Sequence, residues 1–168
     1  MAHDTRNPIE ISTAERSRLL RLAYRFCWNT HDAEEALQAG LLAATRKADQ
    51  LRDQARRWPW LCRVVIQHCH LLGRQRRPQS VDTAALDHRP MSSTDDPAAE
   101  LGPIMRTLIG HLPDQQRAAV TLRHLEGMGY ADIALALGIA ESTARAHVRA
   151  GRDGLRRMMI MRHPEWTP

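Results

Sequence analysis

The chain has 168 residues, a formal net charge of +5 at pH 7 and a pI of about 9.8, which suits one or two small domains with an anionic partner. No apolar run approaches the roughly 20 residues that span a bilayer, and the polar start MAHDTRNPIE lacks a hydrophobic segment, so we expect neither membrane insertion nor a signal peptide. Three irregularly spaced cysteines, Cys27, Cys62 and Cys69, argue against a disulfide framework and favour buried thiols in a cytoplasmic protein.

Apolar residues recur at helical spacing along most of the chain, and the alternation typical of strands is missing, which predicts an all-α fold. Residues 1–11 are expected to form a flexible arm. Ser12 and Glu15 have the spacing of a capping box, so a helix is predicted from there to about residue 28. Its inward face is expected to carry Leu19, Leu22, Ala23, Phe26 and Cys27.

A second helix is expected after a turn at residues 29–31. Asp32 and Glu35 form a cap-like pair at its predicted start, and the helix should run to about residue 48. Residues 49–57 are polar and are expected to form a loop. The buried stripe of this helix is predicted to consist of Ala33, Ala36, Leu37, Leu41 and Ala44.

The next predicted helix, residues 58–77, combines tryptophans with arginines. Arginine beside aromatic rings can hold single-stranded or distorted DNA, and a solvated basic face is the alternative. Trp60 is assigned to the core, whereas Trp58 fits either base stacking or packing. Between residues 54 and 81 there is no acid, and there are six arginines, Arg56, Arg57, Arg63, Arg74, Arg76 and Arg77.

A change of composition separates two predicted domains. Residues 79–96 are rich in Pro, Ser, Thr and Asp, and from Asp82 to Glu100 there are five acids and one arginine. This composition predicts a flexible acidic linker between a domain at 12–78 and a second domain at 97–163, with a tail at 164–168.

The second domain contains a helix-turn-helix pattern. Gly102-Pro103 should delay or kink its first helix, and Gly127 and Gly129 supply a loop. Gly138 is expected to close the first helix of the motif. Gly151 and Gly154 lie in the second helix of the motif, where each is expected to cost about 1 kcal/mol relative to alanine.

The second helix of this motif is predicted to enter the major groove of DNA. Apolar residues at 144, 148 and 155 mark its buried side, and an exposed side carries Arg145, Arg149, Arg152 and Arg156. Ser142, Thr143 and Arg145 would meet base edges, whereas Arg149 and Arg152 suit phosphates. A helical hairpin with a solvated basic face is the alternative.

Metal, cofactor and enzymatic functions are not expected. Adjacent helical residues point about 100° apart, so His68, Cys69 and His70 cannot converge on one ion, and no companion pair has zinc-finger spacing. The sequence contains no phosphate-cradling glycine loop, no nucleophile elbow and no pair of facing carboxylates.

The order of these blocks resembles the bacterial sigma factors of the extracytoplasmic-function (ECF) class. HDAEEALQAGLLAATR and LRDQARRWPWLCRVVIQHCHLLGRQRR resemble region 2 of that family. LPDQQRAAVTLRHLEGMGYADIALALGIAESTARAHVRAGRDGLRRM resembles region 4, with Gln116-Arg117 and Glu126-Gly127 before Tyr130 as its most specific features. The chain departs from the family pattern after Gln38, where Ala39 and Gly40 follow.

The resemblance implies partners for each block. Core RNA polymerase would bind through its β′ clamp helices and its β flap, promoter DNA would be the second partner, and an anti-sigma factor would be the regulator. Contacts to the clamp helices would come from Glu34, Glu35, Gln38 and Leu41. Contacts to the −10 element would come from Arg56, Arg57, Trp58, Arg63, Gln67, His70, Arg74, Arg76 and Arg77. Contacts to the −35 element would come from Ser142, Thr143, Arg145, Arg149 and Arg152.

Two other functions fit parts of the sequence. A transcription regulator with a LuxR-type helix-turn-helix would contain a segment like GIAESTARAHVRAGRDGL. A sigma mimic would bind an anti-sigma factor without starting transcription. The arginine-rich tryptophan helix favours the sigma factor over the first of these.

Overall fold

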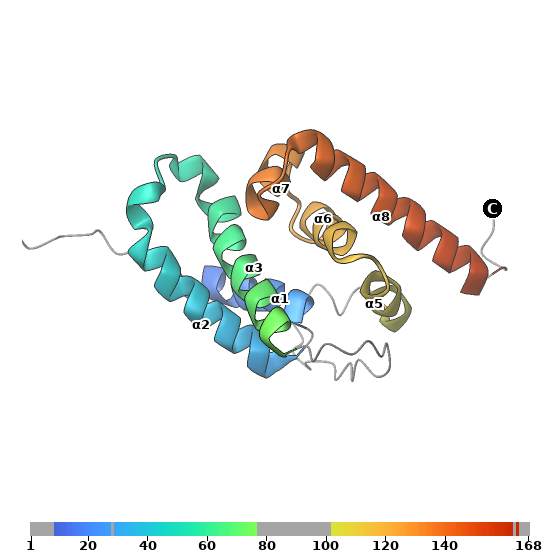
Figure 1. Cartoon of the computed structure of the whole chain (residues 1–168), viewed down its shortest axis with the longest axis horizontal. Helices are drawn as coiled ribbons and strands as arrows, with labels where there is room; N and C mark the ends of the chain where they lie inside the picture. The colour runs from blue at the N-terminus through green and yellow to red at the C-terminus, as the bar shows by residue number, and fades with distance from the viewer. Residues whose placement is uncertain (1–8, 28, 77–101, 163, 165–168) are drawn as a thin grey trace, which may run out of the picture. The chain divides into compact units, whose positions relative to one another are not determined.

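The computed structural model describes residues 9–27, 29–76, 102–162 and 164, and all regular elements in these ranges are helices (Figure 1). The chain divides into two compact units, Met1–Met91 and Ser92–Pro168. The all-α prediction is therefore confirmed for the described residues. The expected linker 79–96, most of the expected arm 1–11 and tail 164–168, and Arg77 lie outside them. None of the described helices is both long and apolar enough to cross a membrane.

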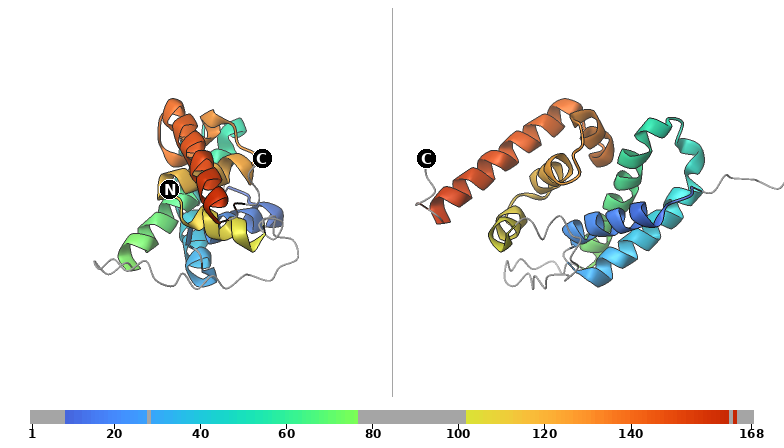
Figure 2. Two further views of the ribbon diagram at one scale, coloured as in Figure 1. Left: turned by 90° about the vertical axis from the view of Figure 1, so that its right-hand side faces the viewer. Right: turned by 180° about the vertical axis from the view of Figure 1, so that it is seen from behind.

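The first unit consists of three helices that pack on one another. They are α1 (Thr13–Cys27), α2 (Thr30–Arg46) and α3 (Arg57–Arg76), and all three pairs are in contact (Figure 2). Two short 3₁₀ helices, η1 (Ala48–Gln50) and η2 (Gln54–Arg56), connect α2 to α3, where the sequence predicted a loop. The fully buried side chains include Leu19, Leu22, Ala33, Ala36, Leu37, Leu61, Cys62 and Val65.

The capping box at the start of α1 is confirmed. The Ser12 backbone N–H donates to Glu15 Oε2 at 2.9 Å, and the Glu15 N–H donates to Ser12 Oγ at 3.2 Å. These two bonds satisfy donors that the first turn of a helix otherwise leaves unpaired.

The predicted cap of α2 is wrong. The Asp32 N–H donates to Asn29 Oδ1 at 2.7 Å, so Asn29 is the N-cap and α2 begins two residues before Asp32. Asp32 instead lies in the first turn, where its carboxylate accepts from Asn29 Nδ2 at 2.9 Å and is favoured by the helix dipole. Asparagine is a strong N-cap because its short side chain reaches the N–H three residues ahead.

A glycine lets α2 approach α3 closely. A Cβ on Gly40 would lie 3.1 Å from Val65 Cγ2 and 3.2 Å from Val65 Cα, so a larger residue would crowd the backbone of α3. The unusual glycine after Gln38 therefore has a packing reason. Leu41, predicted to be buried, is only half-buried.

The cysteines of the first unit are thiols that are not joined in disulfides. Cys62 and Cys69 are buried and Cys27 is half-buried, which agrees with the expectation for two of the three. A hydrogen bond with Cys27 and burial raise the pKa of the Cys69 thiol.

The second unit contains α5 (Pro103–Gly110), α6 (Asp114–His124), α7 (Tyr130–Leu137) and α8 (Glu141–Arg162) (Figure 1). Gly102 is the N-cap of α5 and Pro103 is its first residue, so the predicted delay of this helix is confirmed. α8 packs against α5, α6 and α7. The core residues include Leu108, Leu112, Ala119, Leu122, Ile133, Ala136, Ala144 and Val148.

The weakening expected from Gly151 needs correction. A Cβ on Gly151 would lie 2.5 Å from Val120 Cγ2 and 3.2 Å from the carbonyl oxygen of Gln116. A Cβ on Gly154 would lie 3.0 Å from Leu112 Cδ2. Gly151 is therefore a site of close contact between α8 and α6, and packing offsets its low helix propensity. Next to Gly154 the nearest atom is the end of a leucine side chain, so the weakening expected there stays a prediction.

Candidate nucleic-acid interface

α7 and α8 form a helix-turn-helix. Gly138 ends α7 in the left-handed conformation, with φ of +67°, which favours glycine because it has no Cβ. The N–H of Ile139 then donates to the carbonyl of Ala134 at 3.0 Å, and α8 begins at Glu141. The predicted turn at Gly138 is therefore confirmed.

One side of α8 is buried and the opposite side is exposed. Ala144, Val148 and Gly151 face the core. The five residues predicted to contact the −35 element, Ser142, Thr143, Arg145, Arg149 and Arg152, are all exposed, as is Arg156. The structure thus confirms the predicted exposed arginine side of α8, and contact with DNA stays a prediction.

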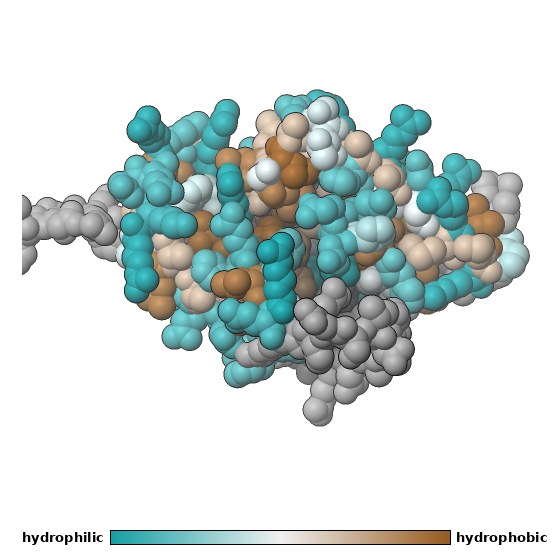
Figure 3. Space-filling model, viewed as in Figure 1, coloured by the Kyte–Doolittle hydropathy of each residue, from teal (hydrophilic) through white to brown (hydrophobic). Residues whose placement is uncertain are grey.

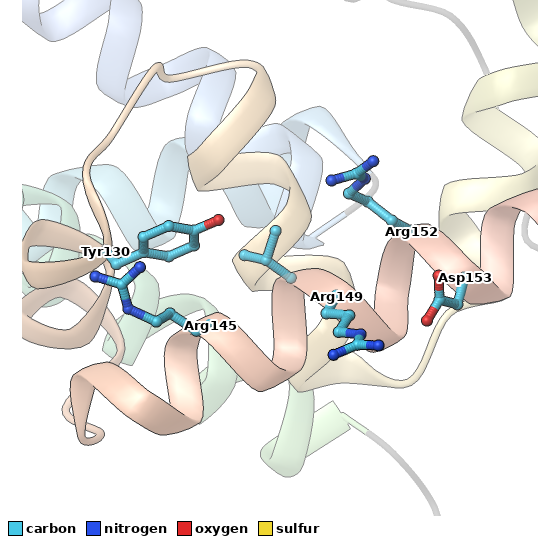
Figure 4. Close-up of a pocket in the computed structure, with 6 residues that line it drawn as sticks. Tyr130, Arg145, Arg149, Arg152 and Asp153 are labelled. Atoms are coloured by element: carbon cyan, nitrogen blue, oxygen red, sulfur yellow. The ribbon is translucent and has the colours of Figure 1, made fainter.

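A shallow pocket of about 390 Å³ opens on this side of α8. It is lined by Tyr130, Arg145, Val148, Arg149, Arg152 and Asp153 (Figure 4). Three arginines and one acid give its rim a net positive charge. Such a surface attracts phosphate and can donate paired hydrogen bonds to guanine.

Arg145 has two contacts within the unit. Its guanidinium donates to Glu141 Oε1 at 2.5 Å, one helical turn earlier on α8. Its Cζ also lies 4.3 Å from the centroid of the Tyr130 ring, at the start of α7. Sequence reasoning missed both partners, although the spacing of Glu141 and Arg145 by four residues is a helical pairing signal.

Cations from α6 adjoin the same side of the unit. Arg123 Cζ lies 4.7 Å from the Tyr130 ring centroid, and its Nη1 donates to the carbonyl of Met128 at 2.8 Å. Burial, followed by the charges of Arg152 and Arg123, lowers the pKa of His124. The two charges come from the end of α6 and the middle of α8, so arginines of both helices lie near His124.

In the first unit, α3 carries a row of polar side chains along one side. Arg63, Gln67, His70 and Arg74 recur at helical spacing, which puts them on one face. Gln67 and Arg74 are exposed, whereas Arg63 and His70 are half-buried. The His70 ring packs on Phe26 of α1, with centroids 5.9 Å apart. Arg76 ends α3, and Arg77 lies outside the described residues.

Two adjacent arginines at the start of α3 have different surroundings. Arg56 is 67% exposed, and its Nε lies 3.5 Å from Asp53 Oδ2. Arg57 is 22% exposed, forms an ion pair with Glu15 of α1, and donates to the carbonyl of Glu10. Arg57 therefore joins α1 to α3, which favours a structural role over the predicted DNA contact.

Trp58 and Trp60 are both half-buried. One face of the Trp58 ring is covered by Arg18, whose Cζ lies 4.1 Å from the ring centroid. This cation–π contact covers part of the ring surface that stacking on a base would use. Trp58 thus packs against Arg18, whereas base stacking, the other possibility that the sequence left open, stays a prediction.

The exposed side of α2 carries the residues predicted to bind polymerase. Glu34, Glu35 and Gln38 are exposed, and Leu41 is half-buried. Leu42, which sequence reasoning missed, is 57% exposed and lies one turn after Gln38. Leu42 therefore adds exposed apolar area to this side of α2.

One group of side chains in the described residues has metal-ligand geometry. Ligand atoms of His31, Asp32 and Glu35 lie within 4.8 Å of one another. Helix capping by Asn29 and the 4.0 Å contact between His31 Nε2 and Glu35 Oε2 account for this group without an ion. His68 Nδ1 lies 2.8 Å from the carbonyl oxygen of Val64 on its own helix.

These features define a class of protein. An all-helical chain in which a helix-turn-helix exposes a row of arginines, joined to a second helical unit with a basic helix, is typical of DNA-binding transcription proteins.

Comparison with known proteins narrows the class. Residues 12–77 match the family Sigma-70 region 2, and residues 104–153 match Sigma-70, region 4. The ECF RNA polymerase sigma factor SigM of Mycobacterium tuberculosis is 36% identical over 143 residues, which cover 84% of this chain and 70% of SigM. The RNA polymerase sigma-H factor of Pseudomonas aeruginosa is 27% identical over 151 residues, which cover 82% of this chain and 78% of the sigma-H factor.

Two solved structures share the fold. The sigma factor RpoE from Bartonella quintana, in complex with the anti-sigma factor NepR, has a TM-score of 0.63 at 20% identity, over 86% of this chain and 91% of that chain. CnrH, in complex with the cytosolic domain of CnrY, has a TM-score of 0.60 at 21% identity. The match covers 87% of this chain and 83% of that chain. The chain belongs to the sigma-70 family of RNA polymerase sigma factors, and within it to the ECF group.

Proposed function

We propose that this sigma factor holds two promoter elements at once on core RNA polymerase. The exposed arginine side of α8 reads the −35 element, and α3 with the segment before it binds the −10 element. The observation that carries this proposal is the orientation of α8, whose apolar side is buried in the unit while Ser142, Arg145 and Arg149 face solvent.

Reading of the −35 element follows from the start of α8. Ser142 and Thr143 are exposed in the first turn of the helix, the part of a recognition helix that meets base edges. Arg145 can make two parallel hydrogen bonds to a guanine, a contact that discriminates by about 1–3 kcal/mol. Arg149 and Arg152 lie further along and suit phosphates, which fix the register without reading sequence.

Promoter opening follows from the segment before α3 and the basic side of α3. Exposed Arg56 and Arg74 offer positive charge to the backbone of an unpaired strand. By family resemblance, residues 49–57 hold a base flipped from the −10 element. Unpairing costs a few kcal/mol, so contacts made only to the open strand favour melting.

Polymerase binding is assigned to α2. Glu34, Glu35, Gln38 and Leu41 would contact the β′ clamp helices, and exposed Leu42 extends this surface. The second unit would contact the β flap. An anti-sigma factor is a further proposed partner, supported by the solved relatives that are named in complex with anti-sigma factors. Such a sigma factor acts in the cytoplasm, where the polymerase is found.

Run-off transcription tests this function. The purified chain is mixed with core polymerase and a genomic promoter library, and the transcripts are sequenced. Specific start sites support a sigma factor. DNA binding without transcripts would point to a LuxR-type regulator, and binding only to an anti-sigma protein would point to a sigma mimic.

A pair of leucine variants tests the polymerase surface in the same assay. Leu42→Ala should weaken core polymerase binding, because it removes an exposed apolar contact on α2. Leu71→Ala, at a leucine that is 51% exposed on α3, is the matched control and should bind polymerase like the unmodified chain. Equal binding by both variants would remove Leu42 from the proposed surface.

A further inference from the structure

The ring of Tyr130 is contacted by two arginines from different helices. Arg145 of α8 and Arg123 of α6 place their Cζ atoms 4.3 Å and 4.7 Å from the ring centroid. Tyr130 is the first residue of α7, so this ring lies where three helices of the unit meet. In Figure 4 the ring lies beside the Arg145 side chain on the wall of the pocket.

The two contacts on Arg145 restrict its side chain from different directions. The Tyr130 ring covers the guanidinium, and Glu141 accepts a hydrogen bond from Nη2 at 2.5 Å. Arginine has many rotamers in water, and a base contact requires one of them. A side chain that already occupies few rotamers loses less conformational entropy when it binds.

Arg123, the second arginine at the Tyr130 ring, is itself held in place by a hydrogen bond. Arg123 donates to the carbonyl of Met128 at 2.8 Å, in the loop that leads to α7. Met128 is buried, and its N–H donates to the carbonyl of Leu122 at 3.0 Å. The Tyr130 ring therefore contacts an arginine whose position is fixed by buried Met128 in the loop before α7.

We propose that Tyr130 is a positioning residue for sequence recognition, in that its ring holds Arg145 ready to contact a base in the −35 element. The proposal rests on the function proposed above. Tyr130 acts through Arg145 and reads no base itself. Its effect is confined to the base pair that Arg145 reads.

Glu141 also affects how Arg145 binds DNA, and its negative charge opposes binding. Its carboxylate repels DNA phosphates and pairs with Arg145 while no base is bound. Arg145 exchanges its hydrogen bond to Glu141 only where DNA offers acceptors in return, such as O6 and N7 of guanine, while the Tyr130 ring continues to restrict its guanidinium. The pair thus lowers binding to unselected sequences more than binding to the preferred one.

The test uses holoenzyme made from the full chain and core polymerase, with promoters randomised over the −35 element. Sequencing of the retained templates gives the preference at every position for the unmodified chain, Tyr130→Phe, Tyr130→Leu, Glu141→Gln and Arg145→Ala. Circular dichroism and thermal melting report whether each variant is folded.

The expected result is specific to position. Arg145→Ala should reduce preference at one base pair by about fivefold or more. Tyr130→Leu should reduce preference at that same base pair by roughly two- to fivefold and leave other positions unchanged. Tyr130→Phe keeps the ring face and should match the unmodified chain. Glu141→Gln should increase binding to all sequences and lower the ratio of preferred to unselected binding.

Three results would overturn the positioning role alone. They are an unchanged preference in Tyr130→Leu where Arg145→Ala changes it, an equal loss at all positions, and a loss in Tyr130→Phe, which would assign the effect to the hydroxyl. Because Tyr130→Phe removes only the hydroxyl oxygen, it should fold, and a loss of preference in it would contradict the proposal even if the leucine variant is unstable. The absence of any −35 preference in the unmodified chain would instead overturn the proposed function, and this inference with it.

Discussion

Gly151 of α8 lies so close to Val120 of α6 that a Cβ at position 151 would be 2.5 Å from Val120 Cγ2. This separation is well inside van der Waals contact. The same Cβ would meet the carbonyl oxygen of Gln116, which belongs to the backbone and cannot rotate away. α8 is therefore held against α6 at a point directly behind the exposed arginines.

Gly151→Ala is predicted to destabilise the second unit by about 1–3 kcal/mol, although alanine is the better helix former. The added methyl group has to displace Val120 or the α6 backbone. Urea or thermal unfolding of the full chain, followed by circular dichroism, measures the change.

Gly73→Ala is the matched control. Gly73 is an exposed glycine in α3 with no atom within 4 Å of the added Cβ, so this change should stabilise by up to about 1 kcal/mol. A higher melting temperature for Gly151→Ala than for the unmodified chain would contradict the packing account.

The contrast between Gly151 and Ser12 shows what sequence can predict here. The capping box at Ser12 and Glu15 is a local pattern of four residues, and it was predicted correctly. The role of Gly151 depends on a residue 31 positions earlier in the chain, which helix propensity cannot include. Asn29 was a local signal too, and it was missed because Asp32 and Glu35 formed a competing pattern.

Arg56 and Arg57 are predicted to differ in function although they are neighbours. Arg56→Ala should lower promoter opening with little change in stability, because its side chain is largely exposed. Arg57→Ala should lower stability by about 1 kcal/mol or more, because it removes the ion pair with Glu15. Permanganate reactivity of the −10 element and thermal melting measure the two effects. Equal melting temperatures for both variants would argue against the structural role of Arg57.

The same ion pair predicts a pH dependence. A hydrogen bond with Arg57, followed by the bond from the Ser12 N–H, lowers the pKa of Glu15 from its ordinary 4.5 to about 2. The unfolded chain therefore binds a proton at higher pH than the folded chain does. The stability that this carboxylate contributes is complete above about pH 5 and is lost as the pH falls from there towards 2.

Glu15→Gln isolates this contribution. The stability difference between the unmodified chain and Glu15→Gln should be largest near pH 6 and should shrink as the pH falls towards 2. Urea midpoints across this range measure it, with Glu34→Gln on the exposed side of α2 as the control. A difference that stays constant with pH would contradict the lowered pKa.

Arg152→Ala is predicted to weaken DNA binding uniformly across sequences. A phosphate contact carries charge and no sequence information, so the salt dependence of binding should fall by about one unit of slope. Binding of the holoenzyme to promoter and unrelated DNA at several salt concentrations measures this. A loss confined to one base pair would assign Arg152 to base reading instead.

The same substitution should raise the pKa of His124. Burial is the main cause that lowers this pKa, and Arg152 is the larger of the two charges that add to it. Removal of that charge should move the pKa part of the way back towards its ordinary value. NMR titration of the imidazole in the full chain measures the shift, and an unchanged pKa would show that Arg152 does not act on His124.

The candidate interface was predictable to different degrees in the two units. The exposed arginines of α8 follow from helical spacing, since Ala144 and Val148 fix which side is buried. The candidate residues around α3 were less predictable, because the sequence gives both Arg56 and Arg57 the same charge. Only the structure shows that Arg56 is exposed and that Arg57 forms an ion pair with α1. The contact of Tyr130 with Arg145 required the tertiary structure, since it joins two helices.

The most direct test of the central claim compares duplex and premelted promoters in run-off transcription. The combined variant Arg56→Ala/Arg74→Ala, with one change in η2 and one in α3, should transcribe poorly from a duplex promoter and regain activity when the −10 element is premelted. The combined α8 variant Arg145→Ala/Arg149→Ala should remain defective on the premelted template, because its loss concerns the −35 element. Equal rescue of both variants, or of neither, would contradict the assignment of two promoter elements to the two helical units.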